Sequence, residues 1–363
     1  MSPATTAKTA RTTFSIPSLD GIRACSFMLV FMAHVGVPLI PGGFGVTVFF
    51  FLSGYLITTL LRREAASSGH ISLKLFYLRR ALRILPPFYL VLSLALVLTL
   101  VGVLPGPFSG AALAAQALHY SNFYVIAHGW RGLLAGTGVY WSLAVEEHFY
   151  LVFPAAYALF VRRAWSGRVQ HALLFAACAL VLVWRCWLVF GQGIVGDRTY
   201  IGSDTRFDSM LFGCALAVWG NPALDFEQNE RPKAWEFLAA GAGALLLLAS
   251  FVLRDPAFRE SVRYSMQGLG LYPLFFFSIR HPDWGFVRAL NLRPVRFVGT
   301  LSYSLYLIHQ VVVYAVWRLA APDAVRALIT LAVSLLLSVL IWRYIEKPLA
   351  KLRSRFSVTH AHP

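Results

Sequence analysis

The sequence is poor in charged residues and in cysteine. Asp, Glu, Lys and Arg make up 13% of its 363 residues, whereas 58% are hydrophobic and the mean hydropathy is +0.64. Soluble domains carry about 25% charged residues, so this composition excludes an ordinary soluble enzyme and indicates a polytopic membrane protein. The four cysteines all fall within or beside apolar segments, which predicts buried thiols and neither a disulfide framework nor a metal site.

Several motifs of soluble enzymes are also missing. The sequence contains no phosphate-binding loop, no cluster spaced as metal ligands, no nucleophile elbow and no dinucleotide fingerprint. Acidic residues number 16 against 32 basic ones, which gives a formal net charge of +16. The basic residues lie mostly between apolar segments, where anionic lipid head groups account for them better than a nucleic acid does. We therefore expect membrane lipid, and no nucleic acid or metal, among the partners.

Long apolar runs predict an all-α membrane bundle with about ten transmembrane helices. Basic residues concentrate in every second connection, which by the positive-inside rule predicts that both termini lie in the cytoplasm. The membrane we expect is the inner (plasma) membrane. Residues 71–84 alternate apolar and basic positions and end at Pro86-Pro87, which predicts one amphipathic interfacial helix before the third span. The expected spans are residues 21–40, 43–61, 86–104, 141–161, 171–190, 207–220, 235–253, 264–279, 298–320 and 325–345.

The chain is expected to form one large domain with a short tail at each end. Residues 1–17 are rich in Thr and Ala, lack the apolar core of a signal peptide, and predict a disordered cytoplasmic tail. Residues 18–350 are expected to form the membrane domain, and residues 351–363 a basic cytoplasmic tail. No clear internal repeat occurs, which weakens an interpretation as a transporter built from inverted halves.

Two ionisable residues, Arg23 and His34, occur in the first apolar segment. Eleven positions correspond to roughly 16 Å along a helix and almost three whole turns, so both side chains face the same way. Ionisable residues inside a membrane span usually face the bundle interior or a water-filled cavity and mark a functional site. We interpret Arg23 as a charged anchor near the cytoplasmic face and His34 as a proton-handling or nucleophilic group farther toward the outer leaflet.

A group of arginines on the expected interfacial helix forms a second candidate. Arg80 and Arg83 are three positions apart, so their guanidinium groups share one face, and Arg79 is adjacent. Guanidinium groups bind phosphate oxygens bidentately, and this helix faces the compartment that holds nucleotide-bearing cofactors. Contact with lipid phosphates is the alternative, because basic helices beside a membrane are common.

Two adjacent carboxylates begin the fourth expected span. Ser142, Glu146 and Tyr150 recur every four residues and form one polar stripe, with Glu147 about 100° round the helix. Neighbouring carboxylates in a poorly solvated place repel each other, so one of them can keep its proton near neutral pH and act as an acid. The alternative is structural pairing of a carboxylate with an arginine of another span. Arg185 and Arg206 are two examples of such an arginine.

Two further segments carry polar residues. The segment from Ser203 to Asp208 has alternating charge, and its Arg206 and Asp208 would suit a network of sugar hydroxyls, although helix capping and local salt bridges are the simpler explanation. In the ninth span, Tyr306 and His309 share one face. A buried Tyr and His usually satisfy each other, so a direct catalytic role is the less favoured interpretation.

The order of these blocks resembles the membrane-bound acyltransferase family 3, which includes O-antigen acetylases, nodulation-factor acetylases and macrolide acyltransferases. The resemblance extends from residue 18 to about residue 350, and the ordered series is far more specific than any single block. Two local departures are Gln310-Val311, where many members have an aromatic residue and proline, and His148, where glutamine is frequent. The matching blocks are Leu19-Asp20-Gly21-Ile22-Arg23 leading to His34, Gly43-Phe44-Gly45-Val46, Phe49 to Ile57, Phe76 to Pro86, Trp141 to Tyr150, Arg206-Phe207-Asp208, Leu301 to Tyr306 and Tyr344 to Pro348.

The resemblance implies transfer of an acyl group, usually acetyl, from cytoplasmic acyl-CoA to a hydroxyl, commonly of a sugar. Acyl-CoA is then a co-substrate, and no cofactor is bound permanently. Arg23 and His34 match the essential Arg-x10-His motif of the family, and Glu146 matches its acidic position in the fourth span. Arg80 and Arg83 match the Arg-x-x-Arg motif implicated in binding the coenzyme. Some members carry a fused soluble esterase-like domain that accepts the acyl group. We expect this chain to lack that domain, and therefore to act alone or with a separate periplasmic partner that accepts the acyl group.

Together these patterns predict an O-acyltransferase for a sugar of a surface polysaccharide, lipopolysaccharide or lipid-linked glycan. His34 is expected to act as general base or to carry the acyl group briefly. One alternative is an acyltransferase for a small glycosylated metabolite such as a macrolide; another, from a different class, is a proton-coupled transporter. The expected site comprises catalytic His34, Arg23, Glu146 and Glu147, coenzyme-binding Arg79, Arg80 and Arg83, and substrate-binding Ser142, Arg206, Asp208 and Tyr306.

Overall fold

A computed structural model describes residues 16–227 and 230–356 of the chain. Within these ranges the protein consists of helices and loops and contains no β-strand. A helix satisfies its own backbone N–H and C=O groups, as lipid requires of every spanning segment. The ten longest helices are α1 (Pro17–His34), α2 (Gly42–Ser68), α3 (Leu73–Leu100), α6 (Tyr140–Arg162), α7 (Gly167–Cys186), α9 (Ser203–Val218), α10 (Ala234–Val252), α12 (Arg263–Arg280), α14 (Arg293–Val316) and α15 (Asp323–Ile341).

Short helices fill several of the connections. Two π-helical turns, Trp187–Gly191 and Trp342–Glu346, continue α7 and α15. The connection between α3 and α6, expected to be a loop, contains two helices. The short helices are α4 (Gly110–Ala117), α5 (Ser121–His128), α8 (Asp197–Ile201), α11 (Pro256–Glu260), α13 (Val287–Leu290) and α16 (Lys347–Ser354).

The ten long helices overlap the ten expected spans one for one. Among the described residues, six helical stretches are long and apolar enough to cross a membrane, which confirms a membrane helix bundle. The other four long helices, α1, α6, α9 and α12, do not meet that standard of length and apolarity. The six stretches are Gly42–Ser68, Leu73–Leu100, Gly167–Gly191, Ala234–Val252, Arg293–Val316 and Asp323–Ser354.

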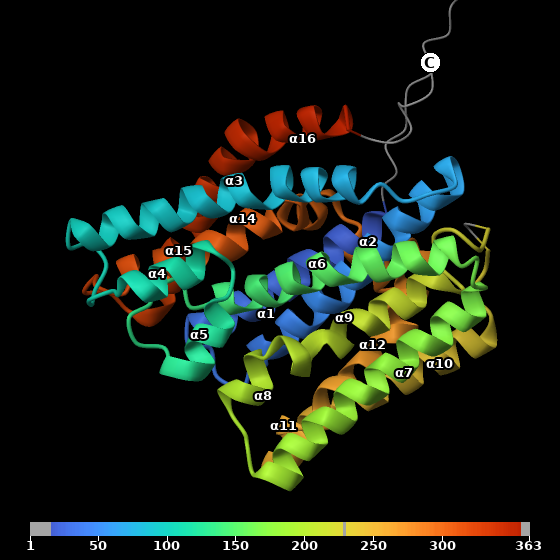
Figure 1. Ribbon diagram of the computed structural model, residues 1–363. Helices are drawn as coiled ribbons and strands as arrows, with labels where there is room; N and C mark the ends of the chain where they lie inside the picture. The colour runs from blue at the N-terminus through green and yellow to red at the C-terminus, as the bar shows by residue number, and fades with distance from the viewer. Residues whose placement is uncertain (1–15, 228–229, 357–363) are drawn as a thin grey trace, which may run out of the picture.

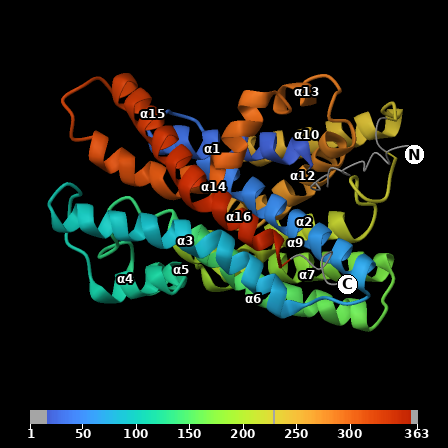
Figure 2. The same cartoon turned by 90° about the horizontal axis from the view of Figure 1, so that it is seen from above.

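Glycines let the central helices α2 and α9 approach closely. In Figure 2 these two helices lie toward the middle, between α3, α4 and α5 at one edge and α10 at the other. A Cβ atom added at Gly54 of α2 would lie 2.0 Å from the Met210 carbonyl oxygen, and one at Gly213 of α9 would lie 2.0 Å from that of Phe51. The two backbones are therefore in direct contact, the kind of packing that small residues give to membrane helices.

The interfacial helix expected before the third span is not a separate element. Helix α3 runs without a break from Leu73 to Leu100 and passes through Pro86 and Pro87 (Figure 1). Each proline removes one intrahelical hydrogen bond, but its fixed φ is itself helical, so packing can hold the helix together. Beside the prolines, the Tyr303 hydroxyl of α14 donates to the Ile84 carbonyl oxygen at 2.8 Å. The expected stop at the prolines was wrong, since the helix continues to Leu100 and this turn is packed against α14.

Helix α1 ends earlier than its apolar run predicts. The run continues to residue 40, but the helix stops at His34 and a loop follows. Gly36 has a φ of +80°, which glycine adopts without strain, and Pro38 cannot donate the hydrogen bond that would continue a helix. His34 therefore stands at the end of α1, beside this loop, instead of inside a longer span.

The expected tails fall mostly outside the described residues. Residues 1–15 and 357–363 are not described, and α1 begins at Pro17. Residues 351–354 belong to α16, which packs against α3 (Figure 1), so the expected boundary at residue 350 falls inside a helix. All four cysteines are free thiols; Cys178 and Cys214 are buried and Cys186 is half-buried, but Cys25 is exposed, contrary to expectation.

Candidate active site

One cavity collects most of the predicted site residues. It is narrow, with a volume of about 90 Å³, and lies between α1, α2, α3, α6 and α14. Side chains from distant parts of the sequence meet in it because these helices pack together. We call it the arginine cavity. The predicted residues that line it are Arg23, Arg80, Arg83, Ser142, Glu146, Glu147 and Tyr306.

The carboxylate of Glu146 accepts hydrogen bonds from two hydroxyl groups in the arginine cavity. Its Oε1 lies 3.0 Å from the Ser53 hydroxyl and its Oε2 lies 3.1 Å from the Tyr150 hydroxyl. The guanidinium of Arg80 lies over the ring of Tyr150, 4.7 Å from the centroid. The polar stripe predicted on α6 therefore faces the cavity, where its acidic group is held close to a cation in a poorly solvated space.

The three neighbouring arginines of α3 divide between two places. Arg80 and Arg83 both line the arginine cavity, as their spacing of three predicts. Arg79 instead donates to the Glu64 carboxylate at 2.6 Å and to the Phe356 carbonyl oxygen at 3.0 Å. Because its guanidinium is held by α2 and by the segment after α16, we assign Arg79 to joining these elements and not to the coenzyme.

Arg23, Ser142 and Tyr306 enter the arginine cavity from three helices. Arg23 of α1 donates to Asp20, one turn earlier, at 3.0 Å. The hydroxyl groups of Ser142 on α6 and Tyr306 on α14 lie 2.7 Å apart and are hydrogen-bonded. A ligand that uses either hydroxyl must compete with this bond, so both groups are already oriented toward the cavity before anything binds.

His34 lies outside the arginine cavity and pairs with a second histidine. Its Nδ1 is 2.9 Å from Nε2 of His309, and the two rings are stacked with centroids 5.1 Å apart. His309 is fully buried and follows Tyr306 by one turn of α14. The expectation that the Tyr306 and His309 side chains satisfy each other is wrong, because the Tyr306 hydroxyl bonds to Ser142 and the His309 ring bonds to His34.

The surroundings of His309 determine which nitrogen of each ring carries hydrogen. Nδ1 of His309 lies 3.0 Å from the Leu305 carbonyl oxygen and 2.9 Å from that of Tyr306. Carbonyl oxygens only accept, so this Nδ1 must be a donor, and in a neutral ring Nε2 is then an acceptor. His34 must therefore donate from Nδ1, which leaves its Nε2 with a free lone pair. The pair is arranged so that His34 Nε2 is the basic nitrogen.

A second cavity opens beside His34. Its volume is about 810 Å³, and it lies between the loop that follows α1, the end of α14 and the start of α15. We call it the histidine cavity. Tyr306 lines the arginine cavity and His34 lines the histidine cavity. His309, one turn after Tyr306 on α14, contacts both residues and lines neither cavity, so it stands between the two linings. The polar and aromatic residues that line it are His34, Gln310, Tyr314, Trp317, Arg318 and Asp323.

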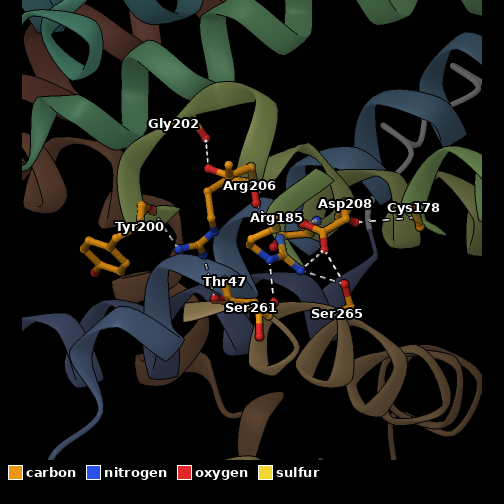
Figure 3. A network of polar contacts seen from close by, with 11 residues as sticks. Thr47, Cys178, Arg185, Tyr200, Gly202, Arg206, Asp208, Ser261 and Ser265 are labelled. Atoms are coloured by element: carbon orange, nitrogen blue, oxygen red, sulfur yellow. Dashed lines mark hydrogen bonds and ion pairs between the residues drawn. The ribbon is translucent and has the colours of Figure 1, made fainter. Parts of the chain in front are cut away.

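Arg206 and Asp208 line neither cavity. Both side chains are fully buried in a separate network, shown in Figure 3. Asp208 forms an ion pair with Arg185 at 2.9 Å and accepts from the Ser265 hydroxyl at 2.6 Å, while Arg206 donates to the Thr47 hydroxyl at 2.9 Å. These contacts join α2, α7, α9 and α12. We therefore assign the two residues to holding the bundle together and not to the substrate.

The same network corrects two alternatives drawn from the sequence. Arg185 and Arg206 have partners within it, so the suggested pairing of either arginine with Glu146 or Glu147 is wrong. Side-chain capping by this segment is also absent, because α9 is preceded by Gly202 and no side chain caps its first turn. The expected local salt bridge does occur. It joins Asp204, at the start of α9, to Arg198 of α8.

The sequence analysis missed two members of the site. Ser53 sits in an apolar run of α2, and His309 was noticed but paired with Tyr306. Both contacts cross to another helix, and His34 and His309 are 275 positions apart. A helical pattern shows which residues share a face, but it does not show which other helix that face meets. The sequence pattern that could have indicated Ser53 is its position as a polar residue within an apolar run.

Comparison with known proteins assigns the chain to a family. Residues 16–343 match the family described as an acyltransferase domain. The chain is 30% identical to the peptidoglycan O-acetyltransferase OatA of Listeria monocytogenes over 354 residues, which cover 93% of this chain and 56% of that protein. It is 28% identical to the O-acetyltransferase OatA of Staphylococcus aureus over 352 residues, which cover 93% and 57%. The chain thus spans a little over half the length of these curated relatives. No solved structure matches it significantly.

The family match extends over all the helices that form the two cavities, and the relatives are named for O-acetylation. It favours an enzyme over the transporter considered from the sequence. Because the match covers nearly the whole chain, this protein belongs to acyltransferase family 3.

Proposed function

We propose that this protein transfers an acyl group, in the simplest case acetyl, from acyl-coenzyme A to a sugar hydroxyl. The observation that carries the proposal is the position of the His34–His309 pair between a cavity lined by arginines and a second, larger cavity. A transfer reaction needs a donor and an acceptor to meet at one basic group. The proposal is that the donor in one cavity and the acceptor in the other meet at His34, whose partner His309 contacts the lining of the arginine cavity through Tyr306.

The arginine cavity suits the donor. A volume of about 90 Å³ has room for a thin chain but not for a nucleotide, so only the acyl end of the coenzyme and the narrow arm that carries it would enter. Arg80 and Arg83 supply guanidinium groups, which bind phosphate oxygens bidentately. The flexible arm of the coenzyme would then cover the roughly 16 Å between Arg23 and His34 along α1. Glu146 and Glu147 balance the positive charge of this cavity, and one of them can serve as an acid.

The reaction follows from the free lone pair of His34. In the direct route, His34 Nε2 takes the proton of the acceptor hydroxyl while that oxygen attacks the thioester carbonyl carbon. The carbon–sulfur bond breaks, and the imidazolium of His34 returns the proton to the leaving sulfur. In the two-step route, Nε2 attacks the thioester carbonyl carbon, the carbon–sulfur bond breaks and the coenzyme leaves as thiolate, which gives an acyl-imidazolium. The acceptor oxygen then attacks the acyl carbon, the carbon–nitrogen bond breaks, and the hydroxyl proton passes to the thiolate. General-base help of this kind typically contributes about 10²–10⁴-fold to the rate.

For the acceptor we propose a glycan such as peptidoglycan or its lipid-linked precursor. One relative is named as a peptidoglycan O-acetyltransferase, which supports this choice. Surface polysaccharide and lipopolysaccharide, expected from the sequence, belong to the same chemical class. A small glycosylated metabolite such as a macrolide is the alternative acceptor. A separate periplasmic partner that receives the acyl group is also part of the proposal.

We propose that all ten long helices span the inner membrane and that both termini are cytoplasmic. The alternation of basic and less basic connections supports this orientation. In a cysteine-free background, Trp165→Cys would lie in a cytoplasmic connection and Arg131→Cys in an outer one. We expect an impermeant thiol reagent to label the Arg131 variant in intact cells and the Trp165 variant only after permeabilisation. The reverse pattern would contradict the orientation.

The catalytic proposal is tested with purified protein in liposomes, radiolabelled acetyl-CoA and a soluble disaccharide. We expect transfer of label to the sugar by the unaltered protein and loss of about 10²-fold or more in His34→Ala. Label retained on the unaltered protein without acceptor, but not on His34→Ala, would favour the two-step route. Full activity of His34→Ala would contradict both routes. Retention of the normal elution volume in size exclusion shows that the variant is folded.

A further inference from the structure

One face of the last described helix, α16, is turned toward the bundle. Glu346, just before this helix, Ala350 and Arg353 recur at intervals of four and three residues, and all three are half-buried. Lys351, which does not share this spacing, is exposed. Residues at such intervals lie on one side of a helix. The Glu346 carboxylate accepts a hydrogen bond from the Ser304 hydroxyl of α14, so this side of α16 meets the bundle.

Arg353 lies beside the arginines of α3. Helix α16 packs against α3 (Figure 1), and the Phe356 carbonyl oxygen, three residues after Arg353, accepts the hydrogen bond from Arg79. The charge of Arg353 is close enough to those of Arg80 and Arg83 for these like charges to repel one another. Arg80 and Arg83 line the arginine cavity, whereas Arg353 does not. Helix α16 thus adds a cation next to the arginine cavity from outside its lining.

These three arginines are not neutralised by direct ion pairs. Within residues 16–227 and 230–356, none of Arg80, Arg83 and Arg353 forms an ion pair with a carboxylate. Glu346 attracts Arg353 from a distance, but its own hydrogen bond comes from Ser304. Guanidinium groups that are gathered in this way repel each other, so an anion that contacts all of them is bound favourably. Phosphate is such an anion, because its oxygens fit the planar fork of arginine.

From this arrangement we infer that Arg353 of α16 is a third phosphate-binding arginine for the coenzyme, an inference that rests on the proposed function. Coenzyme A carries a diphosphate and a further phosphate on its ribose. The arginine cavity admits only the acyl end and its narrow arm, so these phosphates stay outside it. Arg353 is placed to meet them there, opposite Arg80 and Arg83. The phosphate of a lipid head group offers the same chemistry, and the experiments below separate the two sources.

Binding is measured first, in the absence of an acceptor. Coenzyme A is titrated into the purified protein in detergent, and the heat of binding gives its Kd. We expect Arg353→Gln to raise this Kd about tenfold, the effect of one lost hydrogen bond to a charged group. Arg353→Lys keeps the charge without the planar fork and should recover part of the affinity. Arg355→Gln removes the same charge from an exposed position two residues later, and it should leave the Kd unchanged.

Transfer kinetics distinguish a phosphate contact from a structural role. We expect Arg353→Gln to raise the KM for acetyl-CoA about tenfold and to leave kcat/KM unchanged for S-acetyl-N-acetylcysteamine, a thioester donor that carries no phosphate. Equal losses with both donors would show that Arg353 only supports the fold, and the inference would be overturned. If coenzyme A binds and Arg353→Gln weakens its binding, but no acyl transfer occurs, the phosphate contact stands and the proposed function fails.

The lipid source is tested on the same variants. Native mass spectrometry measures how much phosphatidylglycerol the unaltered protein, Arg353→Gln and Arg355→Gln retain. We expect equal retention by all three. Loss of bound lipid in Arg353→Gln, together with an unchanged Kd for coenzyme A, would assign the contact to a lipid head group and overturn the inference. Acyl transfer with an unchanged Kd and KM in Arg353→Gln would overturn it while the proposed function stands.

Discussion

The hydrogen bond between His34 and His309 leads to a specific kinetic prediction. His309→Leu keeps a buried side chain of similar size but removes the acceptor of the His34 Nδ1–H, which is 2.9 Å away in a fully buried position. A hydrogen bond between neutral partners is worth about 1 kcal/mol, or about fivefold. His34 also loses the constraint on its tautomer, and complete loss of base catalysis costs about 10²–10⁴-fold. We therefore expect kcat of His309→Leu to fall by more than about fivefold and by less than about 10⁴-fold.

The assay measures kcat and both KM values by acetyl transfer in liposomes, with His309→Gln as the conservative variant. Glutamine can place an amide oxygen near the former Nε2, so it should recover most of the lost rate. The KM for acetyl-CoA should not change, because His309 lines neither cavity. An unchanged kcat in His309→Leu would refute the reasoning. Equal losses in the Leu and Gln variants, with both normally folded, would show that an acceptor in place of Nε2 does not restore the rate and would also contradict the reasoning.

Three further predictions concern the coenzyme site and the bundle. Arg80→Ala should raise the KM for acetyl-CoA, because Arg80 lines the arginine cavity. Arg79→Ala should leave that KM unchanged and lower the unfolding temperature, because Arg79 pairs with Glu64 of another helix. Equal effects of the two variants on this KM would contradict the division. Asp208→Ala leaves the charge of Arg185 buried without its partner carboxylate, so we expect the protein to lose about 3–5 kcal/mol of stability. The loss is measured as a lower unfolding temperature in detergent, and an unchanged temperature would contradict the structural role. Gly54→Ala should reduce the yield of folded protein in size exclusion because the new Cβ would meet the Met210 carbonyl, while Gly241→Ala, which has open space around it, should be tolerated.

Some features of the site could be predicted because they depend on one helix at a time. The spacing of Arg80 and Arg83 places both on a shared face, and the stripe of Ser142, Glu146 and Tyr150 faces one cavity. Other predictions failed because two residues that are neighbours in the sequence can face different helices. Arg79, next to Arg80, pairs with Glu64 on another helix, and nothing in the local pattern identifies that partner.

The sequence by itself determined the all-helical membrane class, the approximate positions of the helices and the family. It could do so because apolar run length, helical periodicity and an ordered series of motifs are local properties of the chain. Only the tertiary structure decided that His34 pairs with His309, that Asp208 pairs with Arg185, and that α3 continues through its prolines. Each of these depends on which helix faces which, and packing between residues far apart in the chain sets that choice.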